Sequence, residues 1–257
     1  MIRADLLLVE QGLAASRTAA QNLIASGRVS VDEDGRAVPV AKSSQKLPSS
    51  ARLLVTPDAA DRFVSRGGLK MQGALEAAGL DVSGLCALDV GQSTGGFTDC
   101  LLQSGASRVV GVDVGHDQLA ARLAEDPRVT FFEGVNARAL DHAALLAANQ
   151  GVPFDLMVCD VSFISLTLVL PSALPLIGPG GYLLSLVKPQ FEVGRSGIGR
   201  GGIVKDEGLY DGVRQTITTL VQQLGFEVLK WFDSPIKGGD GNREFFIFAR
   251  RPLHMAR

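Results

Sequence analysis

Cysteine is scarce in this chain of 257 residues, and neither sign of charge is in excess. The three cysteines, Cys86, Cys100 and Cys159, lack the spacing of metal ligands. We therefore expect free, buried thiols in a reducing cytoplasm and no metal site. The formal net charge of −2 gives no global sign of nucleic-acid binding, so any surface for RNA must be local.

The sequence also lacks a recognisable signal peptide and an uninterrupted membrane span. Glu10 breaks the apolar N-terminal stretch too early for the hydrophobic part of a signal peptide. Residues 161–187 carry no charge over a length that could cross a membrane. Three prolines and a Gly-Gly pair divide this stretch, which predicts a helix, a turn and a buried strand instead. With 46% hydrophobic residues, the composition indicates a soluble protein with a substantial core.

The most informative stretch runs from residue 88 to residue 98 and reads LDVGQSTGGFT. An apolar run ends in Asp89 and then breaks into glycines before a helix-like segment. This order predicts a buried strand, a tight turn and a helix N-terminus, where a nucleotide-like ligand can approach bare backbone. A second apolar strand, residues 108–112, is followed by Asp113, whose carboxylate can hold ribose hydroxyls. The pair Asp89 and Asp113 therefore predicts a site for an adenosine-containing cofactor.

Two kinds of adenosine cofactor can be compared at this turn. The dinucleotide fingerprint needs G-x-G-x-x-G, with a pyrophosphate facing the helix. Here Ser93 stands where the second glycine is needed, and the carboxylate of Asp89 would repel a pyrophosphate. That carboxylate suits the ammonium end of S-adenosylmethionine, which has no phosphates. We expect a methyltransferase; a nicotinamide oxidoreductase and a glycine-rich turn without a ligand are the alternatives.

The first part of the chain, residues 1–60, predicts a separate, small α+β domain. A short helix over residues 5–10 and a helix over residues 17–25, with Ser16 as its N-cap, precede a hairpin that turns at residues 32–35. So small a core is typical of an appended binding module. The basic residues of this module could contact RNA phosphates. The equally weighted alternative is that they are ordinary solvent-exposed cations, because nearby acidic residues nearly cancel their charge. These basic residues are Arg3, Arg17, Arg28, Lys42 and Lys46.

After a linker at residues 61–64, residues 65–257 predict a large α/β domain. Apolar strands alternate with helical segments, a pattern that predicts a parallel sheet covered on both faces. The last strand follows a long crossover and is expected to insert antiparallel, as in the methyltransferase variant of the Rossmann architecture. The expected strands are 85–90, 108–112, 129–133, 156–160, 182–187, 227–232 and 244–249, and the expected helices are 69–78, 96–104, 117–124, 141–148, 166–170 and 208–224.

Four polar residues stand where such a sheet binds its ligands, at the carboxyl ends of the strands. Asp160 and Lys188 each end an apolar strand, Glu244 begins the antiparallel strand, and Lys70 lies near the start of the first helix. Each of these four residues, taken alone, could simply be a polar side chain exposed to solvent. Together they suit methyl transfer to a hydroxyl, because a partly desolvated lysine near another cation can act as a base that acids orient. We expect Lys188 as the base, oriented by Asp160, with Lys70 and Glu244 completing the network.

These motifs, in this order, resemble a known family from end to end. The N-terminal part, with Ser16-Arg17 and Val29-Ser30-Val31, resembles the S4 RNA-binding module. The set Lys70, Asp160, Lys188 and Glu244 resembles the K-D-K-E tetrad of FtsJ-type ribose 2′-O-methyltransferases. With the segments DVSFIS (160–165), VKPQFE (187–192) and GNREF (241–245), the chain resembles the TlyA family of ribosomal RNA cytidine 2′-O-methyltransferases, whose members are often labelled hemolysins.

The resemblance implies a fold, a cofactor and a substrate. The fold would be a Rossmann-like class I methyltransferase with a seven-stranded, mostly parallel sheet, preceded by an S4-like domain. S-adenosylmethionine would be the cofactor, and cytidines of ribosomal RNA in ribosomal subunits the substrate. The short ends of the chain favour the form that modifies the large subunit, with modification of the small subunit as the alternative. A non-catalytic RNA-binding protein and a membrane-active hemolysin are alternatives of other classes.

The resemblance also implies roles for individual residues. The acidic hairpin tip over residues 32–35 replaces the Asn-Gly turn of the S4 module and is expected to weaken RNA binding. The residues implied to face RNA are Ser16, Arg17 and Arg28. The residues implied to bind the cofactor are Asp89, Gly91, Ser93, Thr94, Gly95, Asp113 and Asn136.

Overall fold

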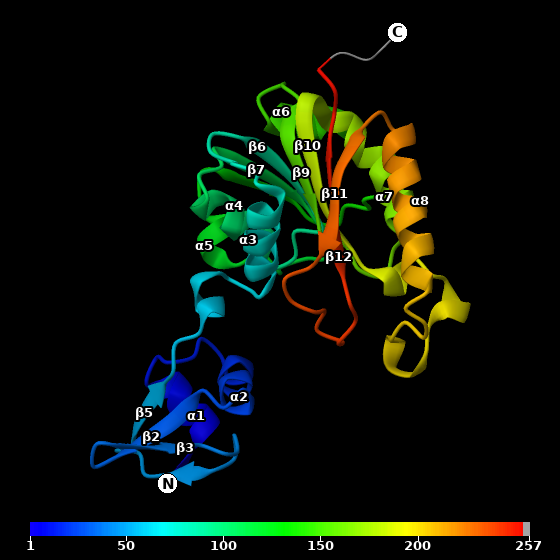
Figure 1. Ribbon diagram of the computed structural model, residues 1–257. Coiled ribbons are helices and arrows are strands. Elements are labelled where there is room, and N and C mark those ends of the chain that lie inside the picture. Colours follow the sequence, from blue (N-terminus) through cyan, green and yellow to red (C-terminus); the bar gives the residue numbers. More distant parts are fainter. Residues whose placement is uncertain (254–257) are drawn as a thin grey trace. The chain divides into compact units, whose positions relative to one another are not determined.

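The structure is a computed structural model that describes residues 1–253, with nothing of the side chains at residues 59 and 60 (Figure 1). The chain divides into two compact units, residues 1–61 and residues 62–257. Each unit has a hydrophobic core of its own. The end of the large domain expected at residue 257 lies outside the described residues.

The N-terminal unit packs two helices, α1 (Ala4–Glu10) and α2 (Arg17–Ala25), against small antiparallel sheets. Ser16 caps α2, since its Oγ accepts a hydrogen bond of 3.2 Å from the backbone N–H of Ala19. The hairpin turns at Asp34 and Gly35, both at positive φ, which suits a two-residue turn. The strands are β1 (Ile2–Arg3), β2 (Val29–Glu33), β3 (Arg36–Pro39), β4 (Lys46–Leu47) and β5 (Arg52–Val55), arranged as a β3-β2-β5 sheet and a β1-β4 pair.

A seven-stranded sheet forms the centre of the large unit, in the order β11-β12-β10-β9-β6-β7-β8. The five neighbouring strands β10, β9, β6, β7 and β8 are parallel to one another. Strand β12 lies between β10 and β11 and is antiparallel to both. The expected fold and the expected antiparallel last strand are confirmed. The strands are β6 (Cys86–Val90), β7 (Arg108–Val112), β8 (Val129–Phe132), β9 (Phe154–Cys159), β10 (Ile177–Val187), β11 (Glu227–Asp233) and β12 (Phe245–Arg250).

Helices cover both faces of this sheet, because side chains along each strand alternate between the faces. In β6, for example, Ala87 packs into one core cluster and Leu88 into the other. One face carries α3, α4 and α5, and the opposite face carries α6, α7 and α8 (Figure 1). These helices are α3 (Gly67–Ala78), α4 (Gly96–Gln103), α5 (Ala121–Ala124), α6 (His142–Ala148), α7 (Leu166–Ala173) and α8 (Leu209–Gln223).

Two elements depart most from their expected bounds, while other ends differ by one to three residues. The helix expected over residues 117–124 is only the single turn α5, because Asp117 takes a φ of 55° and its N–H donates to Glu133. Strand β10 begins at Ile177, well before the expected start at residue 182.

The uncharged stretch 161–187 forms α7, a short 3₁₀ turn and β10, as expected. Among residues 1–253, no helix is both long enough and apolar enough to cross a membrane.

The three cysteines are free thiols. Burial raises the pKa of Cys100 to about 11 and that of Cys159 to about 12. Both thiols therefore stay protonated at neutral pH and act as small apolar side chains of the core.

The strand register brings the expected catalytic residues to one edge of the sheet. Val187, at the end of β10, pairs with Phe245 at the start of the antiparallel β12. Lys188 and Glu244 are the next residues outward along these two strands. Asp160 follows β9, the parallel neighbour of β10. The three side chains thus start from the carboxyl edge, where sheets of this kind bind ligands.

Candidate active site

The turn between β6 and α4 adopts the open backbone that its glycines predict. Gly91 has a φ of 81° and Gly95 a φ of 93°, both in the left-handed region that favours glycine. A Cβ at Gly91 would lie 2.5 Å from the backbone oxygen of Asp160, so glycine lets the turn approach the end of β9. Gly95 is the N-cap of α4, and a Cβ there would collide with Leu123. Gly95 therefore shapes the turn through its backbone.

A cavity of about 620 Å³, here called the Asp113 cavity, lies beside this turn. Gly91, Ser93, Asp113 and Asn136 are among its lining residues. Asp113 accepts hydrogen bonds of 2.7 Å from the backbone N–H groups of Ser93 and Gly115. These bonds fix the direction of the carboxylate and use part of its acceptor capacity. The remaining lone pairs are available to hydroxyl groups of a ligand.

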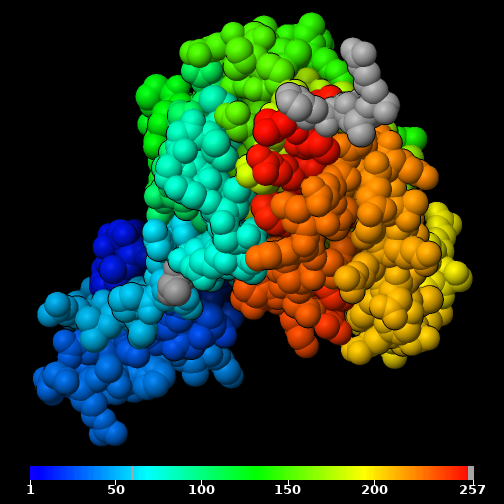
Figure 2. Space-filling model, turned by 45° about the horizontal axis from the view of Figure 1, so that its top comes forward, coloured from blue at the N-terminus to red at the C-terminus, as the bar shows by residue number. Residues whose placement is uncertain are grey.

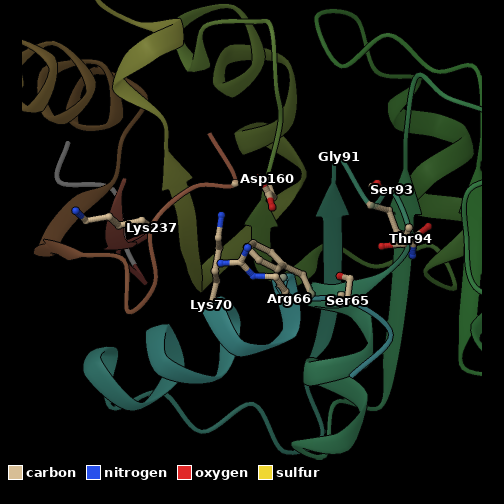
Figure 3. A pocket seen from close by; sticks show the side chains of 13 residues that line it. Ser65, Arg66, Lys70, Gly91, Ser93, Thr94, Asp160 and Lys237 are labelled. Atoms are coloured by element: carbon tan, nitrogen blue, oxygen red, sulfur yellow. The ribbon is translucent and has the colours of Figure 1, made fainter. Parts of the chain in front are cut away.

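A second cavity of about 230 Å³, here called the Lys70 cavity, lies between the turn and the start of α3 (Figure 3). Thr94 of the turn lines it, together with Arg66 and Lys70 at the start of α3. Figure 3 shows Lys70 rising from α3 and Asp160 descending from the end of β9 into this space. Asp160 lines both the Lys70 cavity and the Asp113 cavity. Gly91 and Ser93 also line both, so the two cavities adjoin each other.

Asp89 is fully buried beneath the turn and is not among the lining residues of these cavities. Its Oδ2 accepts a hydrogen bond of 2.7 Å from the hydroxyl of Thr98, which in turn accepts one of 2.8 Å from Gln92. Its Oδ1 has no hydrogen-bond partner among the residues that the structure describes. We expected this carboxylate to face the ammonium end of a cofactor. Burial instead places it under the turn, where it supports the turn from below.

Asp89 should make the stability of the ligand-free protein depend on pH. Burial is the main cause that raises the pKa of its carboxyl from 3.8 to about 7. Because the folded state holds this proton more tightly than the unfolded state, the stabilisation is complete below pH 3.8 and is lost as the pH rises through 7. From about pH 5.5 to about pH 8, wild type should lose about 2 kcal/mol of unfolding free energy that Asp89→Asn keeps. Urea unfolding of both chains measures this difference, and parallel pH profiles would contradict it.

The four polar residues expected at the strand ends form two ion pairs. Lys188 Nζ lies 2.6 Å from Oδ1 of Asp160, and Lys70 Nζ lies 2.6 Å from Oε2 of Glu244. The side chains of Lys188 and Lys70 are only 13% and 12% exposed. Lys188 also donates a hydrogen bond of 2.9 Å to Oγ of Ser162, a partner that sequence reasoning missed. The hydrogen bonds to Glu244 and Ser162 fix the directions of the Lys70 and Lys188 ammonium groups, whereas the contact of Lys188 with Asp160 is an ion pair without hydrogen-bond geometry.

Both ion pairs border a third cavity, of about 470 Å³, here called the Lys188 cavity. Lys70, Lys188 and Glu244 line it, together with Phe163 and Phe191, whose ring centroids are 5.1 Å apart. Phe163 is 91% exposed, has a φ of 63° and also lines the Asp113 cavity. An exposed ring at this backbone position contributes little to the core, and it lies at the edge of both cavities.

Glu244 depends on Lys70 for its charge balance. It is 3% exposed, and burial raises the pKa of its carboxyl, while the hydrogen bond from Lys70 lowers it. A Cβ at Gly238 would lie 2.6 Å from Oε1 of Glu244, so the loop before β12 packs tightly over the carboxylate. Removing Lys70 would leave a buried carboxylate without its cationic partner, which is strongly unfavourable.

Asp5, which the sequence did not single out, organises the basic residues of the N-terminal unit. It is fully buried and accepts hydrogen bonds of 2.8 and 2.9 Å from Arg3, 3.1 Å from Arg17 and 3.0 Å from Gln21. The bonds from Arg3 above all hold the pKa of Asp5 well below its usual range. Arg17 keeps 55% of its side chain exposed, so its guanidinium is held in place and still open to solvent.

Ser16 and Arg28, also expected to face RNA, make bonds within the N-terminal unit. The hydroxyl of Ser16 caps α2. Arg28 donates a hydrogen bond of 3.0 Å to the carbonyl of Thr56 and pairs with Asp61, and its side chain is 17% exposed. Of the three residues, Arg17 therefore presents the most accessible charge.

Comparison with known proteins identifies the family. A family model described as FtsJ-like methyltransferase matches residues 63–251. The chain belongs to this family. It is 42% identical over 254 residues to the 16S/23S rRNA (cytidine-2′-O)-methyltransferase TlyA of Mycobacterium tuberculosis, a match that covers 99% of this chain and 91% of that protein. The resemblance to the TlyA family is thereby confirmed.

Solved structures agree with this assignment. A Streptococcus thermophilus protein described as a hemolysin is 37% identical and superposes with a TM-score of 0.75, covering 98% of this FtsJ-like chain and 88% of that chain. An S-adenosylmethionine-dependent methyltransferase from Mesorhizobium loti, at 17% identity and a TM-score of 0.51, covers 71% of this chain and 98% of that one and shares the fold. The family match makes the chain a methyltransferase that uses S-adenosylmethionine, and the solved structures show its Rossmann-like fold. The nicotinamide oxidoreductase alternative is wrong.

Proposed function

We propose that this FtsJ-like methyltransferase transfers a methyl group from S-adenosylmethionine to the ribose 2′-hydroxyl of a cytidine in ribosomal RNA. Large-subunit RNA is the favoured substrate, and small-subunit RNA is a further one to test. One observation carries the proposal: Lys188, Lys70 and Glu244 line the same cavity, and Asp160, the ion-pair partner of Lys188, lines the two cavities beside it. Asp160 thereby connects these charged residues to the Lys70 and Asp113 cavities, which we assign to the cofactor.

The Asp113 and Lys70 cavities fit the cofactor in shape and charge. Asp113 would accept hydrogen bonds from the ribose hydroxyls, Asn136 would flank the adenine, and the turn with Gly91, Ser93 and Thr94 would hold the rest. Two carboxylates, Asp113 and Asp160, line the Asp113 cavity against one cation, Arg138, a balance that suits a ligand without phosphates. When bound, the cofactor supplies a methyl group that its positive sulfonium has already activated.

The residues around the Lys188 cavity would orient the acceptor and take up its proton. Lys188 would accept the 2′-hydroxyl proton at Nζ, a nitrogen that a hydrogen bond to Ser162 and the contact with Asp160 hold in place. Asp160, at 2.6 Å, then stabilises the ammonium that forms. Lys70 and Glu244 hold the acceptor ribose from the other side, so that its oxygen lies in line with the methyl group.

RNA binding would involve both units of the chain. We assign residues 1–60 to an S4-like RNA-binding domain, residues 61–64 to a linker and residues 65–257 to the methyltransferase domain. Exposed basic residues without a carboxylate within 4.0 Å, as far as the described residues show, lie in or near the segments that line the cavities and suit RNA phosphates. They are Arg66, Arg195, Arg200, Lys205 and Lys237. A ribosomal RNA substrate would place the reaction in the cytoplasm.

Transfer of labelled methyl from S-adenosylmethionine into separated ribosomal subunits tests the proposed function. The subunits should come from a strain that lacks the activity, so that the target ribose is unmodified. We expect label in large-subunit RNA at one cytidine, where the methylated ribose resists alkaline cleavage. Label in the base instead of the ribose would contradict the proposed chemistry. Label in neither subunit, with measurable cofactor binding, would favour a non-catalytic RNA-binding protein.

A further inference from the structure

Two glycine-rich segments form one side of the Lys188 cavity. The segment 198–204 contributes Ile198, Gly201 and Gly202, and the segment 237–244 contributes Gly239, Asp240 and Glu244. The first precedes α8 and the second precedes β12, and both lie at the same end of the large unit (Figures 1 and 2). Segments so rich in glycine have little intrinsic preference for one conformation. Their spacing must therefore be set by specific contacts.

Asn242 supplies those contacts. Its side-chain oxygen accepts a hydrogen bond of 3.1 Å from the N–H of Val204, and its Nδ2 donates one of 3.0 Å to the carbonyl of Gly202. The residue is only 2% exposed. A buried amide that pairs with a donor and an acceptor on a neighbouring segment fixes that segment in both position and direction.

Asp240 extends the same network toward the lysine. Nδ2 of Asn242 donates to its Oδ2 at 2.8 Å, and the backbone N–H of Asn242 donates to its Oδ1 at 3.0 Å. Gln190, two positions after Lys188, donates to the same Oδ2 at 3.2 Å. The side chains of Asp240 and Asn242 thus join three segments: the one after β10, the one before α8 and the one that ends in Glu244.

We propose that Asn242 and Asp240 form a clasp that positions the acceptor ribose, by holding the walls of the Lys188 cavity at a fixed spacing. The residues of the clasp are positioning residues, because Asn242 reaches the cavity through its neighbours. The lining of the Asp113 cavity includes no residue of the segments 198–204 and 237–244, whereas the Lys70 cavity takes only Lys237 and Gly239 from the second segment, so the clasp acts mainly on the acceptor side. This inference rests on the proposed methyl transfer to RNA.

Asn242→Asp tests the clasp. The new carboxylate loses the donor to Gly202 and places a negative charge next to Asp240, so the segments should separate. We expect kcat to fall about 30-fold, because a displacement of about 1 Å at a reacting group has effects of this order. Binding of S-adenosylhomocysteine, measured by calorimetry, should stay within about threefold of wild type. Hydrogen exchange at the N–H of Val204 should become faster.

Asn149→Asp is the matched control. Asn149 is also fully buried, and its Nδ2 donates to the carbonyls of Val152 and Pro153 at 2.9 and 3.3 Å. It lies just before β9, at the amino edge of the sheet and away from the site. This variant should lose thermal stability like Asn242→Asp, yet keep kcat within about twofold of wild type. Equal losses of kcat in both variants would overturn the clasp.

The double variant Asp240→Asn/Asn242→Asp reverses donor and acceptor within the clasp. It should recover part of the kcat that Asn242→Asp loses, which a general loss of folding would not permit. No recovery would overturn the proposal. If Asn242→Asp does not fold, Asp240→Ala replaces it in the test. A fall in kcat of at least about threefold with normal cofactor binding would support the clasp. A kcat equal to that of wild type would overturn it.

Failure of the proposed function can be told apart from failure of the clasp. If wild type methylates no ribosomal RNA, the proposed function fails, while exchange at Val204 still shows whether Asn242 holds the segment. If wild type is active and Asn242→Asp is equally active, the proposed function stands and the clasp is wrong.

Discussion

Lys188→Ala is expected to lower kcat for methyl transfer about a thousandfold while leaving the binding of S-adenosylhomocysteine nearly unchanged. The proposed base is lost, and Asp160 loses the ammonium that lies 2.6 Å away. Single-turnover methyl transfer to ribosomal subunits and calorimetric titration of the cofactor product measure the two effects. The removal of one lysine from the Lys188 cavity leaves the turn and Asp113 intact, which is why binding should survive.

Lys188→Arg separates the role of a base from that of an ion-pair partner. A guanidinium can keep the pair with Asp160, but it stays protonated and cannot accept a proton at neutral pH. We therefore expect this variant to be as inactive as Lys188→Ala. Substantial activity in Lys188→Arg would show that Lys188 only orients the acceptor, and another group would then have to take the proton.

Gly91→Ala is expected to destabilise the protein by about 3 kcal/mol and to weaken cofactor binding more than about tenfold. Alanine is strained at a φ of 81°, and its Cβ would lie 2.5 Å from the backbone oxygen of Asp160. Because a backbone atom cannot turn aside like a flexible side chain, the turn and the end of β9 must separate. Thermal unfolding and calorimetric titration with S-adenosylhomocysteine measure the two losses.

Gly79→Ala is the control for backbone strain alone. Gly79 ends α3 at a φ of 68°, and a Cβ there would have no heavy atom within 4 Å among the described residues. This variant should lose about 1 kcal/mol and bind the cofactor product like wild type. The difference between the two alanine variants then measures the close approach of Gly91 to β9. Equal losses of stability and of cofactor binding in the two variants would show that the close approach of Gly91 to β9 contributes to neither.

Several features of the fold could be predicted because they depend on neighbours along the chain. The alternation of apolar strands with helices, the glycine turn at residues 91–96 and the Ser16 cap each arise within a few residues, where periodicity and turn chemistry act. The antiparallel last strand followed from its long crossover. Element ends were less predictable: Asp117 left the helical conformation because its N–H bonds Glu133, a partner in a later segment.

In the candidate site too, some features could be predicted from the sequence and others could not. Lys70, Asp160, Lys188 and Glu244 could be chosen from sequence, since strand ends of a parallel sheet meet at one edge. Of their contacts, the pair Lys188–Asp160 was expected from sequence, but the direct pair Lys70–Glu244 and the hydrogen bond from Lys188 to Ser162 were not. Lys70 and Glu244 are 174 residues apart, and their pairing depends on how α3 packs beside β12.

Sequence by itself therefore determined the order of elements, the fold class and the residue types gathered at the sheet edge, because local periodicity and strand ends suffice for these. Tertiary structure alone decided that Lys70 pairs with Glu244, that Asp89 lies buried beneath the turn, and that Asp5 and Asn242 join separate segments. The physical reason is that hydrogen bonds and desolvation depend on atoms brought within a few ångströms by packing. Such neighbours come from distant segments and leave no periodic trace in the chain.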